Sequence, residues 1–162
     1  MKKILFLSKG EDSASTRYRA LQFFPLLAQA GFKVAHATAS GGPLVLIDAL
    51  RLAAGADLVV VLRKVFPLPL LWLLRRVSRR LVFDFDDAIF CNSDGSPSAT
   101  RMRRFSEMVR VCDHVLAGNQ FLADSARKFN PAVTLLPTSL VAQDYSVAVD
   151  KPESTIDVVW IG

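Results

Sequence analysis

The sequence predicts an α/β fold, a Rossmann-like, doubly wound and mainly parallel sheet with helices on both faces. Three observations lead to this prediction. Short apolar runs recur along the chain, turn residues follow each run, and a segment with helical spacing then precedes the next run. Four of the six runs are continuous rather than alternating, as expected of strands buried on both faces of a parallel sheet. Such alternation of strands and helices is typical of doubly wound folds.

Six segments are predicted as strands. The continuous apolar runs occupy residues 4–8, 57–62, 81–85 and 133–137. Two weaker runs, 33–39 and 114–118, fit strands nearer an edge of the sheet. Because ligands of such sheets bind at the carboxyl ends of the strands, polar residues at those ends are the first candidates for a site.

The first helix is predicted over residues 15–31, where apolar side chains recur at helical spacing. Ser15 or Thr16 provides its N-cap, and Gly31 ends it. Pro25 should kink this helix, because proline lacks the N–H that an interior position needs.

Four more helices are predicted, at residues 43–55, 67–80, 100–112 and 120–129. The apolar face of the helix over 67–80 consists of Leu70, Leu71, Leu74 and Val77. That of the helix over 100–112 consists of Met102, Phe105, Val109 and Cys112. We expect both faces to be buried.

Length and composition indicate one folded domain in a reducing compartment. A chain of 162 residues can bury a core, and 51% hydrophobic against 22% charged residues excludes a disordered chain. Two cysteines provide no disulfide framework, and residues 1–12 fit a first strand better than a signal peptide. The longest apolar region contains Arg63, Lys64 and two prolines and does not fit a membrane span. We therefore expect a cytoplasmic protein.

Positive charge is concentrated in the middle of the chain. The net charge is +5, and half of the twenty basic residues lie between positions 63 and 110. A positive face attracts phosphate-bearing partners, although a solvated basic surface gives the same pattern. Residues 67–80 join Trp72 and Leu73 to four arginines. This combination predicts peripheral contact with the inner face of a membrane, and the alternative is a core helix with a basic end.

Three carboxylates cluster around the end of the fourth predicted strand, in the sequence FDFDDAIF. As a haloacid dehalogenase phosphatase motif, Asp84 would be the nucleophile and Asp86 the general acid, with magnesium between them. That motif requires glycine and threonine where this chain has Asp87 and Ala88, and it normally occupies the first strand. The D-x-D pair of metal-dependent glycosyltransferases is a second match, too short to be specific.

A third match uses much more of the chain. Its segments, in order, are SASTRYRALQFFPLLAQAGFKV, DLVVVLRKV, RLVFDFDDAIF, DHVLAGNQFLADSARKF, VTLLPTS and DVVWIG. This ordered set resembles the N-terminal half of GT-B glycosyltransferases, most closely the bacterial family 4 enzymes. The resemblance covers essentially all 162 residues.

The resemblance implies an enzyme of two Rossmann-like domains that face a cleft. The N-terminal domain would shape the site of a glycan or lipid-linked acceptor, and the C-terminal domain would hold most of the nucleotide-sugar donor. Transfer would retain the anomeric configuration and use neither metal nor cofactor. Residues 1–147 would then form the acceptor-side domain, 148–156 a linker, and 157–162 the first strand of a missing donor-binding domain. We expect the chain to be inactive alone.

Two sets of site residues are predicted from the strand ends and the resemblance together. The predicted acceptor contacts are Asp86, Asp87, Arg63, Lys64 and Asn119. The predicted phosphate or donor contacts are Gly10, Ser15, Thr16, Arg17 and Arg19. Asp84, deeper on its strand, is expected to belong to the fold. No metal ligands and no catalytic residue are assigned.

Plainer explanations apply to several of these residues. Asp86 and Asp87 would cap the following loop. Ser15 or Thr16 would be a simple N-cap beside solvated arginines, and the two histidines, His36 and His114, fit structural roles. A phosphate- or nucleic-acid-binding module is a different class of function, but the chain has no nucleic-acid motif and we expect no such partner. The sequence does not identify the donor sugar, the acceptor or the pathway.

Overall fold

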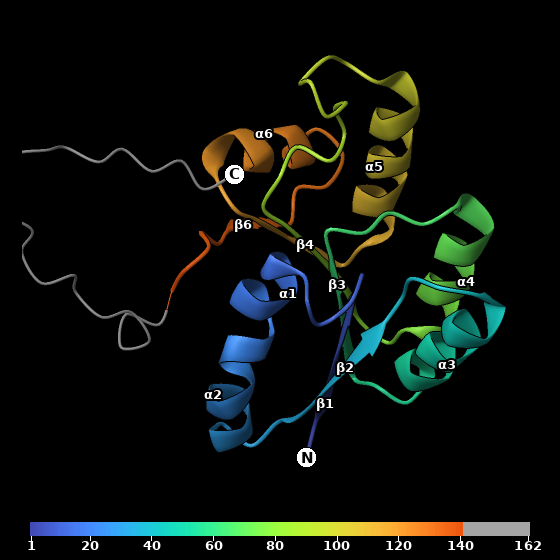
Figure 1. The fold of residues 1–162 in the computed structure, drawn as a ribbon, viewed down its shortest axis with the longest axis vertical. Helices are drawn as coiled ribbons and strands as arrows, with labels where there is room; N and C mark the ends of the chain where they lie inside the picture. The colour runs from blue at the N-terminus through green and yellow to red at the C-terminus, as the bar shows by residue number, and fades with distance from the viewer. Residues whose placement is uncertain (141–162) are drawn as a thin grey trace, which may run out of the picture.

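All six strands pair in parallel within one sheet, in the order β2-β1-β3-β4-β5-β6 (Figure 1). The computed structural model describes residues 1–140. The strands in this part of the chain are β1 (Lys3–Ser8), β2 (Lys33–Thr38), β3 (Leu58–Leu62), β4 (Leu81–Phe85), β5 (His114–Ala117) and β6 (Val133–Leu135). Each lies within two residues of its predicted bounds, and the predicted α/β fold is confirmed.

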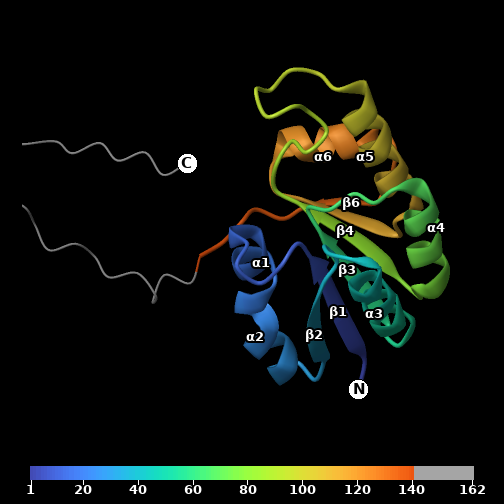
Figure 2. The ribbon, with the colours of Figure 1, turned by 45° about the vertical axis from the view of Figure 1, so that its right-hand side comes forward.

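Helices cover both faces of the sheet (Figure 2). They are α1 (Ala14–Arg19), α2 (Phe24–Gln29), α3 (Pro43–Ala54), α4 (Leu68–Val77), α5 (Ala99–Val111) and α6 (Gln120–Arg127), with a 3₁₀ turn η1 (Leu21–Phe23). α1 and α2 pack on one face and α3 to α6 on the other. The strand order explains this division. The chain steps from β1 to β2 in one direction along the sheet and afterwards moves in the other, so right-handed crossovers put their helices on opposite faces.

Aromatic side chains fill the core on both faces of the sheet. Phe83 and Phe85 of β4 are fully buried against Phe105 of α5, with ring centroids 6.2 and 5.2 Å apart. On the other face, the ring of Phe6 in β1 lies 5.5 Å from that of Phe24 in α2. Burial on both faces is the reason why these strands consist of continuous apolar runs.

The predicted first helix is divided into two. α1 ends at Arg19, Ala20 leaves helical geometry with φ −134° and ψ −68°, and η1 leads into α2. Pro25 lies in the first turn of α2, where its missing N–H has no helical partner to lose. It therefore starts a helix, and the prediction of one kinked helix is wrong. Ala20 is fully buried at the break.

The buried faces of α4 and α5 largely follow the predicted pattern. Leu71 and Leu74 of α4 are buried, and the other two members of their face pack against the same core. On α5, Met102 is 37% exposed and Met108 is fully buried instead. Met102 lies in the first turn of the helix, before α5 reaches the phenylalanine cluster around Phe105, which corrects the predicted face at this residue.

Three predicted segments lie outside the described residues. They are the linker 148–156, the strand 157–162 and the last seven residues of the predicted domain 1–147. Among residues 1–140, no helix combines the length and apolar character that crossing a membrane requires.

Candidate functional site

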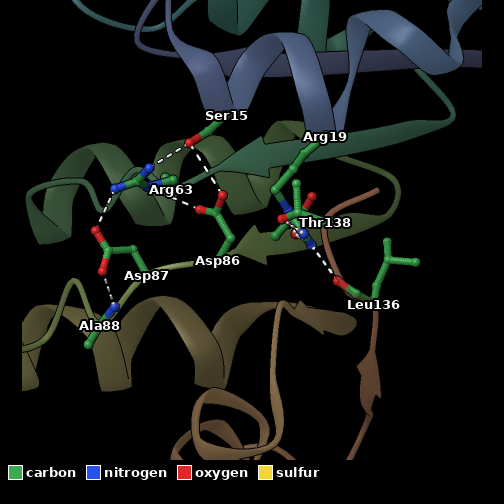
Figure 3. A network of polar contacts seen from close by, with 9 residues as sticks. Ser15, Arg19, Arg63, Asp86, Asp87, Ala88, Leu136 and Thr138 are labelled. Carbon is green, nitrogen blue, oxygen red and sulfur yellow. Dashed lines mark hydrogen bonds and ion pairs between the residues drawn. The ribbon is translucent and has the colours of Figure 1, made fainter. Parts of the chain in front are cut away.

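The strand order changes direction between β1 and β3, and polar residues gather beside this point at the carboxyl ends of the strands. Ligands of open α/β sheets bind at such a switch point, where the loops diverge to opposite faces. Ser15 in α1, Arg63 after β3 and Asp86 after β4 contact one another there (Figure 3). The structure thus brings together residues from both predicted sets.

Arg63 is the centre of this cluster. Its Nη1 donates to Ser15 Oγ at 2.6 Å, its Nη2 donates to Asp87 Oδ2 at 2.6 Å, and its Nε lies 3.2 Å from Asp86 Oδ1. Its backbone has a φ of 46°, the left-handed conformation that costs a non-glycine residue about 1–2 kcal/mol. Strain of this kind persists where the surroundings hold it, and it is typical of functional sites.

Asp86 has a carboxylate oxygen without a hydrogen-bond donor among the described residues. Its Oδ2 accepts a long hydrogen bond of 3.5 Å from Ser15 Oγ. Its Oδ1 is shielded from solvent, and the contact with Arg63 Nε is an ion pair that lacks hydrogen-bond alignment. Buried polar atoms are nearly always hydrogen-bonded, so the charge of Arg63 is what compensates Oδ1 among the described residues.

Asp87 combines two roles that were separate explanations at the level of the sequence. Its Oδ1 accepts from the Ala88 N–H at 2.8 Å, which caps the following loop. Its Oδ2 orients Arg63, as described above. The side chain is 63% exposed, so it also remains accessible to a ligand.

Arg19 lies inside the fold. Its Nε and Nη2 donate to Asp84 Oδ1, the first at 2.9 Å, and both side chains are almost completely buried. Its remaining hydrogen bonds go to Leu136 O at 3.0 Å and to Thr138 Oγ1 at 2.9 Å. The predicted phosphate contact of Arg19 has no support in this geometry, because the guanidinium already serves buried partners. Asp84 belongs to the fold, as expected from its depth on the strand.

The same ion pair weighs against the phosphatase alternative. Asp84 would be the nucleophile of that motif, yet it is buried and bound by a guanidinium. Within residues 1–140, no three or more His, Cys, Asp or Glu side chains form a group that could hold a metal ion.

The pKa of Asp84 leads to a prediction about stability. Burial raises this pKa to about 6, although the hydrogen bonds and charge of Arg19 pull it down. Between pH 4 and 6 the folded protein therefore binds a proton more tightly than the unfolded chain. The contribution of Asp84 to the free energy of unfolding should fall by about 3 kcal/mol as the pH rises through this window.

Urea denaturation of the wild-type chain and of Asp84→Asn, from about pH 3.5 to 8, measures this effect. We expect the stability of the wild type relative to the variant to decrease with rising pH and to level off above pH 7. An advantage that grows with pH would mean that the Arg19 charge, and not burial, controls Asp84.

The loop between β1 and α1 is organised around Ser8. Its Oγ accepts from Thr16 Oγ1 at 2.8 Å and from the Gly10 N–H at 3.1 Å, and it lies 2.8 Å from His36 Nε2. Thr16 is therefore buried in a network that holds the loop, while Gly10, with a φ of 155°, adopts a conformation that other residues rarely take. Arg17 is exposed, so it is the arginine of the predicted phosphate set whose charge faces solvent.

Lys64 and Asn119 both have partners within the fold. Lys64 Nζ donates to Ser40 Oγ at 2.6 Å and lies 5.6 Å from the centre of the Phe66 ring. Asn119 Oδ1 accepts from the Leu122 N–H at 3.0 Å and caps α6. Their predicted acceptor contacts stay predictions.

Gly118 keeps β5 close to the site. A Cβ at this position would lie 2.9 Å from Asp86 Cα, which is closer than real side chains approach. We expect Gly118→Ala to lower the free energy of unfolding by about 1–3 kcal/mol, because Asp86 must move. Gly55→Ala is the matched control, since its Cβ would make only ordinary contacts, 3.6 Å from Leu52 O and 3.9 Å from Arg51 O. Urea denaturation compares the two, and an equal loss would show that the contact with Asp86 is unimportant.

Two hollows adjoin Arg63. A pocket of about 160 Å³ lies toward α1 and is lined by Ser8, Ser13, Ser15, Thr16 and Leu62, together with Lys9 and Arg63. A groove of about 660 Å³ lies toward the loop after β4. Lys9 and Arg63 line both.

The groove also includes Arg101 and Phe121, which the sequence analysis did not select. Lys9 directly follows β1, so its position at a strand end could have identified it from the sequence. Arg101 and Phe121 could not be identified in this way, because they resemble ordinary residues on the surface of a helix.

Comparisons with known proteins identify the fold. Neither family models nor curated proteins match this chain. Among solved structures, Anabaena HepE in complex with UDP and glucose matches with a TM-score of 0.58 at 17% identity, covering 91% of this chain and 47% of HepE. An alpha-glucosyltransferase in complex with UDP and a 13-mer DNA containing a HMU base matches with a TM-score of 0.53 at 15% identity, covering 85% of this chain and 41% of that one. The chain thus has a glycosyltransferase-like fold and spans less than half the length of these proteins.

Proposed function

We propose that this chain is the acceptor-side domain of a glycosyltransferase that moves a sugar from a nucleotide-sugar donor to a glycan or lipid-linked acceptor. The observation that carries the proposal is the cluster of Ser15, Arg63, Asp86 and Asp87 at the switch point of the sheet. Its support is a fold shared with HepE, which binds UDP-glucose in its solved complex.

The arrangement of the two hollows supports specific roles. The smaller pocket offers hydroxyls and cations, which suit a donor phosphate. The groove of about 660 Å³ is large enough for a sugar, and we call it the acceptor groove. Because Lys9 and Arg63 line both, the two substrates would meet beside them. Asp87, which lines the larger hollow and is largely exposed, would accept a hydrogen bond from a substrate hydroxyl, while Arg63 would compensate its charge.

The finer features of the proposal follow the resemblance to GT-B enzymes of family 4. They are a second Rossmann-like domain that holds most of the donor, retention of configuration, and transfer without a metal. The isolated chain would then be inactive, and the enzyme would work in the cytoplasm. A nucleic-acid-binding module is not favoured, because the described chain has a glycosyltransferase-like fold instead of a nucleic-acid motif.

The test is turnover of a panel of nucleotide sugars, followed by release of the free nucleotide. It should use both the 162-residue chain and the chain extended by whatever coding sequence follows residue 162. We expect turnover by the extended form and none by the chain alone. An extended form that neither binds nor turns over any nucleotide sugar would refute the proposal.

Peripheral membrane contact is part of the proposal, and the outer surface of α3 and α4 supports it. Trp72 is 58% exposed in α4, beside exposed Leu73 and Arg76. The neighbouring α3 adds Leu44, 77% exposed, and Ile47 (Figure 1). Apolar side chains next to arginines suit a surface that lies on anionic lipid.

Flotation with vesicles of anionic and of neutral lipid tests this contact. We expect the wild type to bind anionic vesicles at low salt. We expect Trp72→Ser/Leu73→Ser to bind them at least about ten-fold more weakly, because two apolar side chains no longer enter the bilayer. Leu26→Ser is the matched control, since Leu26 is exposed on α2 at the opposite face of the sheet. No flotation of the wild type, or equal losses in both variants, would exclude this surface.

A further inference from the structure

The acceptor groove carries positive charge that the described residues do not neutralise. Lys9, Arg63 and Arg101 line it, and Asp87 is the carboxylate on its wall. Asp87 is already paired with Arg63 at 2.6 Å. Lys9 and the Arg101 guanidinium form no ion pair or hydrogen bond with any residue among positions 1–140. The groove therefore contains two cations that are not paired with any described carboxylate. Because the surface is concave, the electrostatic fields of the two cations add within the groove.

Lys64 is close enough to Lys9 to feel its charge, although it does not line the groove. Burial lowers the pKa of Lys64, and the charge of nearby Lys9 lowers it further. The partner of Lys64 is the hydroxyl of Ser40, which carries no charge. Two ammonium groups that repel each other beside a groove are stabilised by a bound anion, since it attracts both.

The rest of the groove suits the uncharged part of a sugar. Phe121 is largely exposed on the groove wall, and its ring packs 6.0 Å from that of Phe90. Asn92 adds a polar side chain on the same wall. Ligand sites commonly combine aromatic surface with a few polar groups that fix orientation. The groove thus has apolar, polar and cationic parts side by side.

We propose that the acceptor is an anionic sugar, with a phosphate or carboxylate that binds to Lys9 and Arg101 in the acceptor groove. As a statement about the acceptor, this inference rests on the proposed function. The anion site itself rests on the groove alone and is measurable without sugar transfer. The proposal commits to a sugar-sized anion rather than a nucleic acid, because the cations lie within a bounded hollow next to an exposed aromatic ring.

The experiment follows amide signals of the ¹⁵N-labelled 162-residue chain by NMR during titration at constant ionic strength. The probes are glucose 1-phosphate, glucuronate and the neutral methyl glucoside. We expect at least one of the two anions to bind about ten-fold more tightly than methyl glucoside, with the largest shifts at residues that line the groove. Comparison of the two anions distinguishes a phosphate from a carboxylate.

Two double variants locate the site. Lys9→Gln/Arg101→Gln should weaken binding of the preferred anion about ten-fold, whereas Lys33→Gln/Lys128→Gln should change it less than two-fold. The control removes the same charge at the amino end of β2 and the C-terminal end of α6. Equal binding of methyl glucoside, or equal losses in both variants, would overturn the proposal. Binding of a DNA oligomer through Lys9 and Arg101, without binding of either anionic sugar, would overturn it in favour of a nucleic-acid acceptor.

These outcomes are separate from those of the proposed function. Anion binding in a protein that turns over no nucleotide sugar would leave this site intact and reject the glycosyltransferase. Efficient transfer to neutral acceptors only would reject the anionic acceptor and leave the glycosyltransferase intact.

Discussion

Arg19→Met is expected to lower the free energy of unfolding by about 3–5 kcal/mol, because it leaves the buried Asp84 carboxylate without its cation. This is a large share of the stability of a domain of this size, which is about 5–15 kcal/mol. The variant also loses the hydrogen bonds to Leu136 and Thr138. Urea denaturation followed by circular dichroism at pH 7 measures the loss.

Two further variants separate the buried charge from other causes. Arg79→Met removes an ion pair of similar length, 2.8 Å to Asp57, that is exposed, and should cost much less, because water screens exposed pairs. Arg19→Met/Asp84→Leu removes both buried charges and should recover most of the loss, since apolar residues can replace a buried pair. If Arg19→Met costs no more than Arg79→Met, the buried pair contributes nothing beyond a surface contact.

Asp86→Asn/Asp87→Asn should reduce kcat/KM of the complete transferase about 100- to 1,000-fold. The substitutions retain size but remove the two carboxylates that pair with Arg63, and Asp87 is the one that lines the groove. Loss of one preorganised polar contact in an active site commonly has an effect of this size. The measurement is the initial rate of transfer from the preferred nucleotide sugar.

Asp94→Asn provides the control for this double variant. Asp94 lies in the same loop and accepts hydrogen bonds only from Ser96 among the described residues, so its substitution should change kcat/KM less than two-fold. Circular dichroism of all variants checks that the fold is kept. Wild-type rates in the folded double variant would remove Asp86 and Asp87 from the site.

The sequence was sufficient to predict the sheet, because residues buried on both faces leave continuous apolar runs such as 81–85. It also placed Arg63 and Asp86 in one predicted set, because both follow strands whose carboxyl ends meet at one edge, whereas Ser15 belonged to a separate predicted phosphate set. Both inferences depend only on periodicity and topology. The structure confirms the sheet and brings these three side chains into contact.

Other features depend on interactions that no local pattern records. The break occurs at Ala20, which is fully buried against the sheet. Arg19 has the same sequence context as Arg17, yet one is buried and the other exposed, because only Arg19 faces Asp84, 65 positions away. The left-handed backbone of Arg63 and the close approach of Gly118 to Asp86 are likewise tertiary effects.

The bonds from Arg19 to Leu136 and Thr138 span 117 and 119 positions, from the first helix to the segment after the last strand. Closing so long a loop costs more entropy than forming the local strand–helix–strand units, so these bonds should form after the folding transition state. Interactions that are absent from the transition state slow unfolding and leave the folding rate nearly unchanged. The contacts of Arg19 across the chain would therefore set the lifetime of the native domain before it unfolds. They would have little influence on how quickly the domain folds.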